Sequence, residues 1–237
     1  MKRAVEPELL DELAADDPRA IWSRRDLQRV NALMGNAGIT ARALEVAFAG
    51  GAPRTIVDLG AGDGKPLLRL AKRMRPHWKS VRAVLVDRKR LLTARAQAEF
   101  AAIGWTVECA EMDVFEWLGR PRPENSDLTI ASLFLHHCED DDLRKLLALA
   151  AHQTAVFLAC EPRRATFTFC AASLLGFVGC NSVTRHDARV SVRAGFAGGE
   201  LSALWPAGEE WRLTERPAGL FSHCFVAQRI GEKGSVS

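Results

Sequence analysis

The sequence has little of what marks a secreted, membrane-bound or metal-binding protein. Its six cysteines form no Cys-x-x-Cys pair, which argues against a zinc or redox site of that kind. Met1 to Asp17 is rich in acids from Glu6 onward and holds no apolar signal segment. The longest apolar run, Ala165 to Cys180, is interrupted by polar residues and is shorter than the roughly 20 apolar residues of a membrane-spanning helix. We therefore expect free, buried thiols and a cytoplasmic location.

The sequence also lacks a strong excess of charge of one sign. Against 29 Asp and Glu stand 32 Lys and Arg, a formal net charge of +3. So weak a basicity does not by itself indicate nucleic acid or anionic lipid as a partner. With 48% hydrophobic and 26% charged residues in 237, the chain has the composition of a globular protein with one principal core.

The spacing of apolar residues changes once along the chain. Between Glu8 and Phe48 they recur at helical spacing, with breaks at Asp17-Pro18 and at glycines, which predicts two or three short helices. Beyond residues 50–53, short apolar runs alternate with helical stretches, as in a parallel sheet with crossover helices. The pattern predicts strands at 55–59, 83–87, 105–109, 128–134 and 154–160, helices at 65–74, 90–103 and 143–151, and a closing antiparallel hairpin of 211–215 and 221–228.

This order of elements predicts the fold class. We expect a Rossmann-like, doubly wound α/β fold with a seven-stranded, mostly parallel sheet and an antiparallel closing strand. Residues 1–52 would form an N-terminal helical cap and residues 53–237 the main domain. A mostly helical insertion at about 161–206 would cover the site of that domain.

A glycine loop follows the first predicted strand and opens a helix. It reads Val57-Asp58-Leu59-Gly60-Ala61-Gly62-Asp63-Gly64, and Lys65 stands where a dinucleotide fingerprint needs its third glycine. Glycines at this place let a ligand approach backbone N–H groups closely. The acid Asp58, ahead of the loop, would repel a pyrophosphate and attract a ligand that carries an ammonium group near a sulfonium. S-adenosylmethionine is such a ligand.

The segment Val57 to Gly64 resembles motif I of the class I S-adenosylmethionine-dependent methyltransferases. The resemblance covers about residues 55–159, and Leu133 to His137 resembles the Leu-His-His segment of the branch that methylates small molecules. It implies that Asp87 holds the ribose of the cofactor and Met112-Asp113 its adenine; as an alternative, each aspartate caps the helix after it. The cofactor-binding residues implied are Asp58, Gly60, Ala61, Gly62, Asp87, Arg88, Met112, Asp113 and Ser132.

Histidines are the candidate catalytic residues. His136 and His137 follow a central strand, at the edge of the sheet where open α/β folds bind ligands. With an ordinary pKa near 6.5, either imidazole could remove the proton of an acceptor hydroxyl, and either could instead be a structural group. His186 is a further candidate catalytic residue. We expect no metal site, because the consecutive acids Asp140 to Asp142 fan around a helix and cannot converge on one ion.

The predicted helical segments hold most of the candidate residues for binding the acceptor. The apolar run Thr166 to Val178 either packs as core or lines a pocket for an apolar acceptor. Our candidate substrate-binding residues are Trp22, Glu161, Phe169 and Arg193. We expect a small aromatic or polyketide-like acceptor, methylated at oxygen, with neither nucleic acid nor a membrane as partner. The alternatives are an RNA methyltransferase, suggested by basic residues between Arg69 and Arg90, and a non-catalytic protein that binds S-adenosylmethionine.

Overall fold

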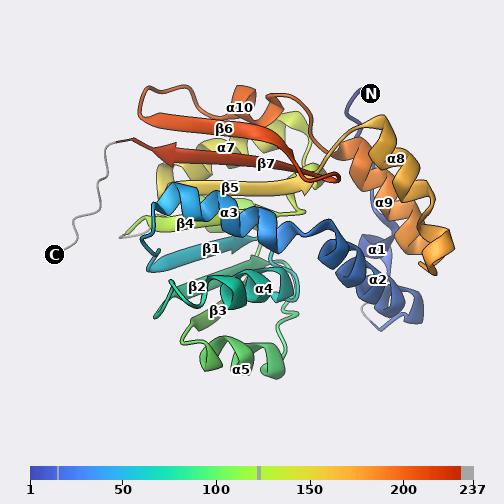
Figure 1. Cartoon of the computed structure of the whole chain (residues 1–237), viewed down its shortest axis with the longest axis horizontal. Helices are drawn as coiled ribbons and strands as arrows, with labels where there is room; N and C mark the ends of the chain where they lie inside the picture. The colour runs from blue at the N-terminus through green and yellow to red at the C-terminus, as the bar shows by residue number, and fades with distance from the viewer. Residues whose placement is uncertain (15, 122–123, 231–237) are drawn as a thin grey trace.

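The structure is a computed structural model and describes residues 1–14, 16–121 and 124–230. Its elements are arranged around one twisted sheet (Figure 1). No helix in these residues is both long and apolar enough to cross a membrane. The strand order is β3-β2-β1-β4-β5-β7-β6, and β7 runs antiparallel to both of its neighbours. The predicted Rossmann-like fold is therefore confirmed. The strands are β1 (Thr55–Leu59), β2 (Arg82–Asp87), β3 (Thr106–Glu111), β4 (Ser126–Ser132), β5 (Thr154–Pro162), β6 (Trp211–Ala218) and β7 (Ser222–Arg229).

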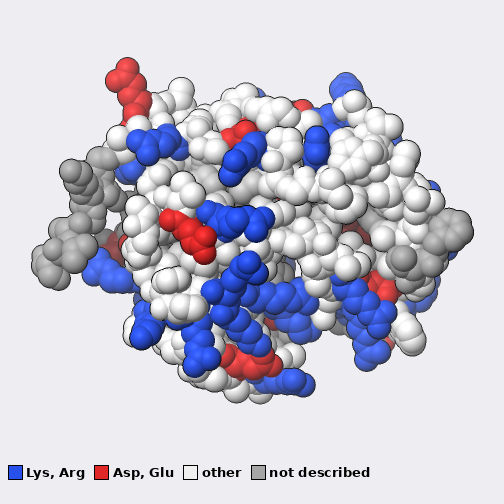
Figure 2. All heavy atoms as spheres, in the orientation of Figure 1, with Lys and Arg blue, Asp and Glu red and all other residues white. Residues whose placement is uncertain are grey.

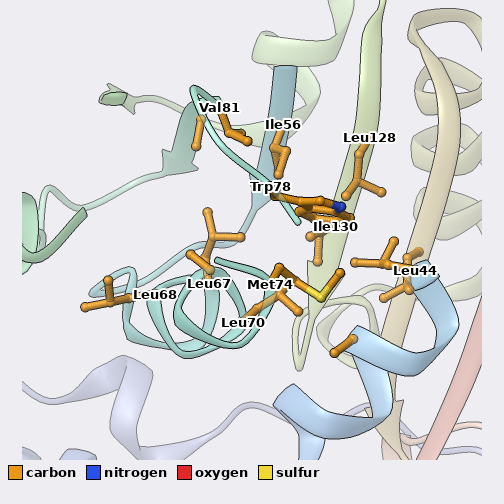
Figure 3. Packing of buried hydrophobic residues seen from close by; sticks show 14 of the residues in the cluster. Leu44, Ile56, Leu67, Leu68, Leu70, Met74, Trp78, Val81, Leu128 and Ile130 are labelled. Atoms are coloured by element: carbon orange, nitrogen blue, oxygen red, sulfur yellow. The ribbon is translucent and has the colours of Figure 1, made fainter. Parts of the chain in front are cut away.

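Helices cover both faces of the sheet (Figure 1). One face carries α3 (Asn36–Phe48), α4 (Lys65–Met74) and α5 (Ala94–Ala102), and the other carries α6 (Val114–Gly119), α7 (Asp140–Gln153) and α10 (Glu200–Leu204). Successive residues of a strand point to opposite faces, so the buried strands are apolar on both sides. Figure 3 shows Leu44 of α3 and Met74 of α4 packing with Ile56 and Ile130 of the sheet, beside the buried indole of Trp78.

A lobe of four helices lies at the carboxyl ends of β4 and β5 (Figure 1). It consists of α1 (Leu9–Glu12), α2 (Pro18–Met34), α8 (Thr166–Ser173) and α9 (Ser182–Ala194), and α9 packs against the other three. Buried carboxylates fasten it: Asp187 accepts hydrogen bonds from the N–H groups of Leu9 and Leu10, and Asp26 accepts one from Asn181. The amino-terminal residues and the helical insertion thus build one structural unit.

Several element boundaries differ from the prediction by one to four residues, and three of these differences have a clear local reason. β4 ends at Ser132, not at residue 134, because Leu133 has a left-handed backbone with φ 55°. β6 continues through Pro217. Proline has no N–H to donate, but β6 is an edge strand with a partner on one side only, so the sheet can accommodate it there. The helix expected from residue 90 begins only at Ala94, where the Thr93 side chain accepts the N–H of Ala96.

Candidate active site

The glycine loop is held by β2 and open toward a cavity. Gly60 has φ 65°, and a β-carbon added there would lie 2.2 Å from the Phe134 ring, so only glycine fits. The N–H groups of Gly60 and Ala61 donate to the Val86 carbonyl at 2.9 and 3.2 Å. At Gly62, which has φ 56°, an added β-carbon would meet nothing within 4 Å. The loop therefore offers open backbone where a ligand can approach.

Two aspartates flank the loop. Asp58, on β1, is 3% exposed, and burial together with the charge of Asp87 raises the pKa of its carboxyl to about 7. Asp87 ends β2, and its carboxylate accepts the N–H groups of Gly62 and Lys89, both at 2.9 Å. A cationic ligand near these carboxylates would stabilise both of their ionised forms.

The acid after β3 caps the helix that follows it, and its contact with adenine stays a prediction. Asp113 caps α6 by accepting the N–H of Phe115 at 2.8 Å, and it also forms an ion pair with Arg88 at 2.6 Å. Burial would raise the pKa of Asp113, but these bonds to Arg88 and Phe115 outweigh it and lower the pKa. Met112 donates its N–H to the Asp87 carbonyl at 3.0 Å, which joins the ends of β2 and β3.

A cavity of about 620 Å³ lies between the loop and the helical lobe. This volume is typical of small-molecule sites. Its walls include Gly60, Gly62, Asp87, Arg88, Asp113, Phe134 and His137 from the sheet side, and Leu10, Leu27, Gln28 and Asn31 from the lobe side. Gln28 donates to the Asp63 carboxylate at 3.1 Å and so ties the lobe to the glycine loop. The cavity is thus enclosed by parts of the chain that are far apart in sequence.

A short turn after β4 carries the histidine pair. Glu161, fully buried at the end of β5, accepts the N–H groups of Phe134 and Leu135, each at 3.0 Å. Its other carboxylate oxygen lies 2.7 Å from Nδ1 of His136. These three contacts shape the 3₁₀ turn η1 (Leu135–His137) directly beside the cavity. Glu161, expected to contact substrate, instead contacts the protein's own turn.

His136 is held between two carboxylates. Its Nε2 lies 3.5 Å from the carboxylate of Glu8, which arrives from the amino-terminal segment and also accepts the hydroxyl of Ser191. Burial alone would lower the pKa of His136, but the contacts with Glu161 and Glu8 outweigh it and raise the pKa to about 9. The pKa of Glu8 is lowered, because its bond to His136 outweighs burial. His136 is therefore an imidazolium at neutral pH and is not available to take a proton.

His137 occupies a different position. Its side chain is exposed and borders the cavity, with its ring centroid 4.2 Å from that of His136. One ligand atom from each of Glu8, His136 and His137 also lies within 4.8 Å of the others, a spacing compatible with a metal ion. Nothing in the local sequence indicates Glu8, because only the folded lobe brings it to this histidine pair.

The remaining predicted residues lie elsewhere, and none borders the cavity just described. Trp22 is 60% exposed on α2, and Phe169 is half-buried on α8. Arg193 forms an ion pair with Glu6 at 3.0 Å. His186 is partly exposed, with Nδ1 3.2 Å from the buried Asp187. Ser132 borders a second, smaller cavity, and the side chains of Phe177 and Val178 lie outside the described ones.

Comparison with known proteins indicates which kind of cofactor to test against this site. Residues 56–155 match the family model of a methyltransferase domain. The fold resembles the plantazolicin methyltransferase BpumL, solved in complex with S-adenosylhomocysteine (SAH), with a TM-score of 0.64, 11% identity, and coverage of 90% of this chain and 91% of that one. The part of the chain that holds the glycine loop and the turn η1 is therefore similar to a methyltransferase domain. A search of curated protein sequences finds no match.

Two further solved structures share the fold of this chain. The mitomycin 7-O-methyltransferase MmcR has a TM-score of 0.57 and 19% identity over 93% of this chain. An O-methyltransferase family 2 protein from Planctomyces limnophilus, in complex with apigenin, has a TM-score of 0.58 and 15% identity over 93% of this chain. This chain spans only 60% and 64% of the lengths of those two proteins.

The residues of the site fit S-adenosylmethionine. The buried carboxyl of Asp58 has no cationic partner among the described residues, and the ligand brings an ammonium and a sulfonium. Gly62 leaves the loop free of side chains where a ligand can approach the backbone, whereas Gly60 makes room for the Phe134 ring. The carboxylate of Asp87, at the end of β2, borders the larger cavity, and Asp58 borders a smaller one that adjoins it. Predicted cofactor contacts at Asp58, Gly60, Gly62 and Asp87 thus lie together around one loop.

Proposed function

We propose that this chain is an S-adenosylmethionine-dependent methyltransferase that acts on a hydroxyl oxygen of a small aromatic or polyketide-like acceptor bound in the larger cavity. The observation that carries this proposal is His137 at the wall of that cavity, with the buried ring of His136 directly behind it. The two O-methyltransferases of the same fold, one solved with apigenin, support the acceptor class. The acceptor would lie between the turn η1 and the lobe residues Leu10 and Leu27.

The roles follow from the geometry of the turn. When bound, S-adenosylmethionine supplies a methyl group activated on a sulfonium. His137, exposed to the cavity, accepts the proton of the acceptor hydroxyl as it attacks the methyl carbon. His136 is a positioning residue, because both of its nitrogens face carboxylates and it fixes the turn that presents His137. The helical lobe excludes water from the reaction and aligns the acceptor with the methyl group.

The His137→Gln variant tests the proposal. We expect kcat with a phenolic acceptor such as apigenin to fall roughly 10²-fold to 10³-fold, since general-base catalysis contributes about that much. The dissociation constant for SAH, measured by calorimetry, should change by less than about twofold. His152→Gln is the matched control, because His152 is exposed at the far end of α7.

Two further measurements test the acceptor atom and the involvement of a metal ion. Each phenol in the acceptor panel is paired with the corresponding aniline, and methylation of the anilines alone would contradict transfer to oxygen. Dialysis against EDTA should leave the rate unchanged. A rate lost with EDTA and restored by a divalent cation would assign Glu8, His136 and His137 to a metal instead of to proton transfer.

A further inference from the structure

A second cavity, of about 460 Å³, adjoins the first. It lies between the end of α2, the start of α3 and the side of α4 that faces α3, and Asp58 and Ser132 also line it. Asn31, Pro66, Arg69 and Leu133 border both cavities, so the two spaces meet beside the cofactor loop. A ligand in one can therefore extend into the other.

Three arginines line this second cavity. Arg42 comes from α3, and Arg69 and Arg73 come from successive turns of α4. None of the three forms a hydrogen bond or ion pair with a residue that the structure describes. The lysines of the same helix behave differently: Lys65 pairs with Asp63, and Lys72 pairs with Glu99. The unpaired cations of α4 are thus the ones that face the cavity.

The guanidinium groups of Arg42 and Arg73 converge on one point. Nη1 of Arg42 and Cζ of Arg73 each lie 3.7 Å from the place where a β-carbon of Gly38 would stand. Figure 2 shows Lys and Arg side chains gathered over α3 and α4 on this face. Like charges this close repel, and among the described lining residues the only acid is Asp58. An anion between the arginines would relieve the repulsion and accept charge-assisted hydrogen bonds.

We propose that this cavity binds a carboxylate or phosphate group of the acceptor, which makes the acceptor an anionic small molecule. This inference rests on the proposed function and deepens it. The acceptor would place its anionic group among Arg42, Arg69 and Arg73, and its hydroxyl would reach the larger cavity past Leu133. The same chemistry could come from the carboxylate of the cofactor itself. Arg73 lies eight residues along α4 from Lys65, roughly 12 Å from the cofactor loop, which favours the acceptor.

The experiment uses full-length protein saturated with SAH, so that the carboxylate of the cofactor is already in place. Calorimetry compares 4-hydroxybenzoate with phenol, its uncharged match. We expect 4-hydroxybenzoate to bind at least tenfold more tightly, and this preference to shrink as ionic strength rises. The Arg42→Gln, Arg73→Gln double variant should lose the preference. Lys72→Gln should keep it, because Lys72 lies on the same helix but outside the cavity.

Each result separates the possible explanations. If SAH binds and phenol binds as tightly as 4-hydroxybenzoate, the anion site is refuted and the proposed function stands. If the preference persists in the double variant, the arginines are not the site. If the double variant instead loses tenfold or more in SAH affinity, the arginines serve the carboxylate of the cofactor. If SAH does not bind the wild-type protein, the proposed function fails with the inference.

Discussion

At the scale of single residues, Asp58 shows how burial prepares a site for a cation. Its carboxyl lies at the core end of the glycine loop, where burial and the neighbouring Asp87 raise its pKa to about 7. Near neutral pH, this residue is therefore divided between the protonated and ionised forms. A cationic ligand favours the ionised form, so binding of the cofactor is coupled to release of a proton.

This coupling predicts a pH-dependent affinity for S-adenosylmethionine. Below pH 7 the Asp58 carboxyl must lose its proton when the ligand binds, so the dissociation constant should rise about tenfold from pH 8 to pH 6. Calorimetry at pH 6 in two buffers of different ionisation enthalpy should detect the proton released. Asp58→Asn should bind weakly and without this pH dependence, whereas Asp63→Asn should retain it. Equal affinity at both pH values would contradict the role of Asp58.

At the scale of elements, the turn η1 is built by one buried side chain. The carboxylate of Glu161 accepts two backbone N–H groups and contacts His136, so β5 determines the conformation of the chain that leaves β4. Leu133, with φ 55°, makes the bend that this arrangement requires. The turn is thus stabilised by a charge pair and not by apolar packing alone.

The charge pair of His136 and Glu161 predicts how the free energy of unfolding depends on pH. The pKa of His136 is about 9 in the folded chain and near 6.5 when unfolded, so its contribution is complete below pH 6.5 and is lost as pH rises through 9. Urea titrations should show the free energy of unfolding falling across this window by on the order of 3 kcal/mol. His136→Gln should flatten the slope and His152→Gln should not. Equal slopes in wild type and His136→Gln would show that the turn does not depend on this charge.

Removing the carboxylate of Glu161, the partner of His136, should lower the free energy of unfolding strongly. Glu161→Gln leaves the buried imidazolium of His136 without its closer counter-ion, and breaking a buried pair in this way typically costs about 3 to 5 kcal/mol. Denaturant unfolding at pH 7 measures this loss. Glu139→Gln, at the exposed start of α7, is the control and should change stability by less than about 0.5 kcal/mol. A Glu161→Gln variant as stable as wild type would refute the structural role of the carboxylate.

At the scale of the whole molecule, the site exists only because two units meet. The sheet contributes the glycine loop and the turn η1, and the lobe contributes Glu8, Leu10 and Gln28. A ligand that fills the cavity contacts both units and should stabilise their association. The free energy of unfolding is therefore expected to depend on cofactor concentration.

Ligand-linked stability provides the test at this scale. SAH at 100 times its dissociation constant should raise the free energy of unfolding by about 2.7 kcal/mol, the value that mass action requires for one site. Thermal unfolding followed with SAH and, separately, with NADH distinguishes the two kinds of nucleotide. Stabilisation by NADH and not by SAH would contradict the assignment of the loop.

Local pattern by itself determined most of the fold and the cofactor loop. Apolar periodicity is a property of neighbouring residues, so it indicated the strands and helices, and the spacing of Gly60, Gly62 and Gly64 indicated a backbone that approaches a ligand. Tertiary structure alone decided the chemistry of the histidines. Glu8 and Glu161 meet His136 from distant parts of the chain, and the pKa that results depends on burial and on charges that only folding brings together. The roles of the basic residues of α4 also depend on the fold: Lys72 pairs with Glu99 of α5, whereas Arg69 and Arg73 line the second cavity and pair with no residue that the structure describes.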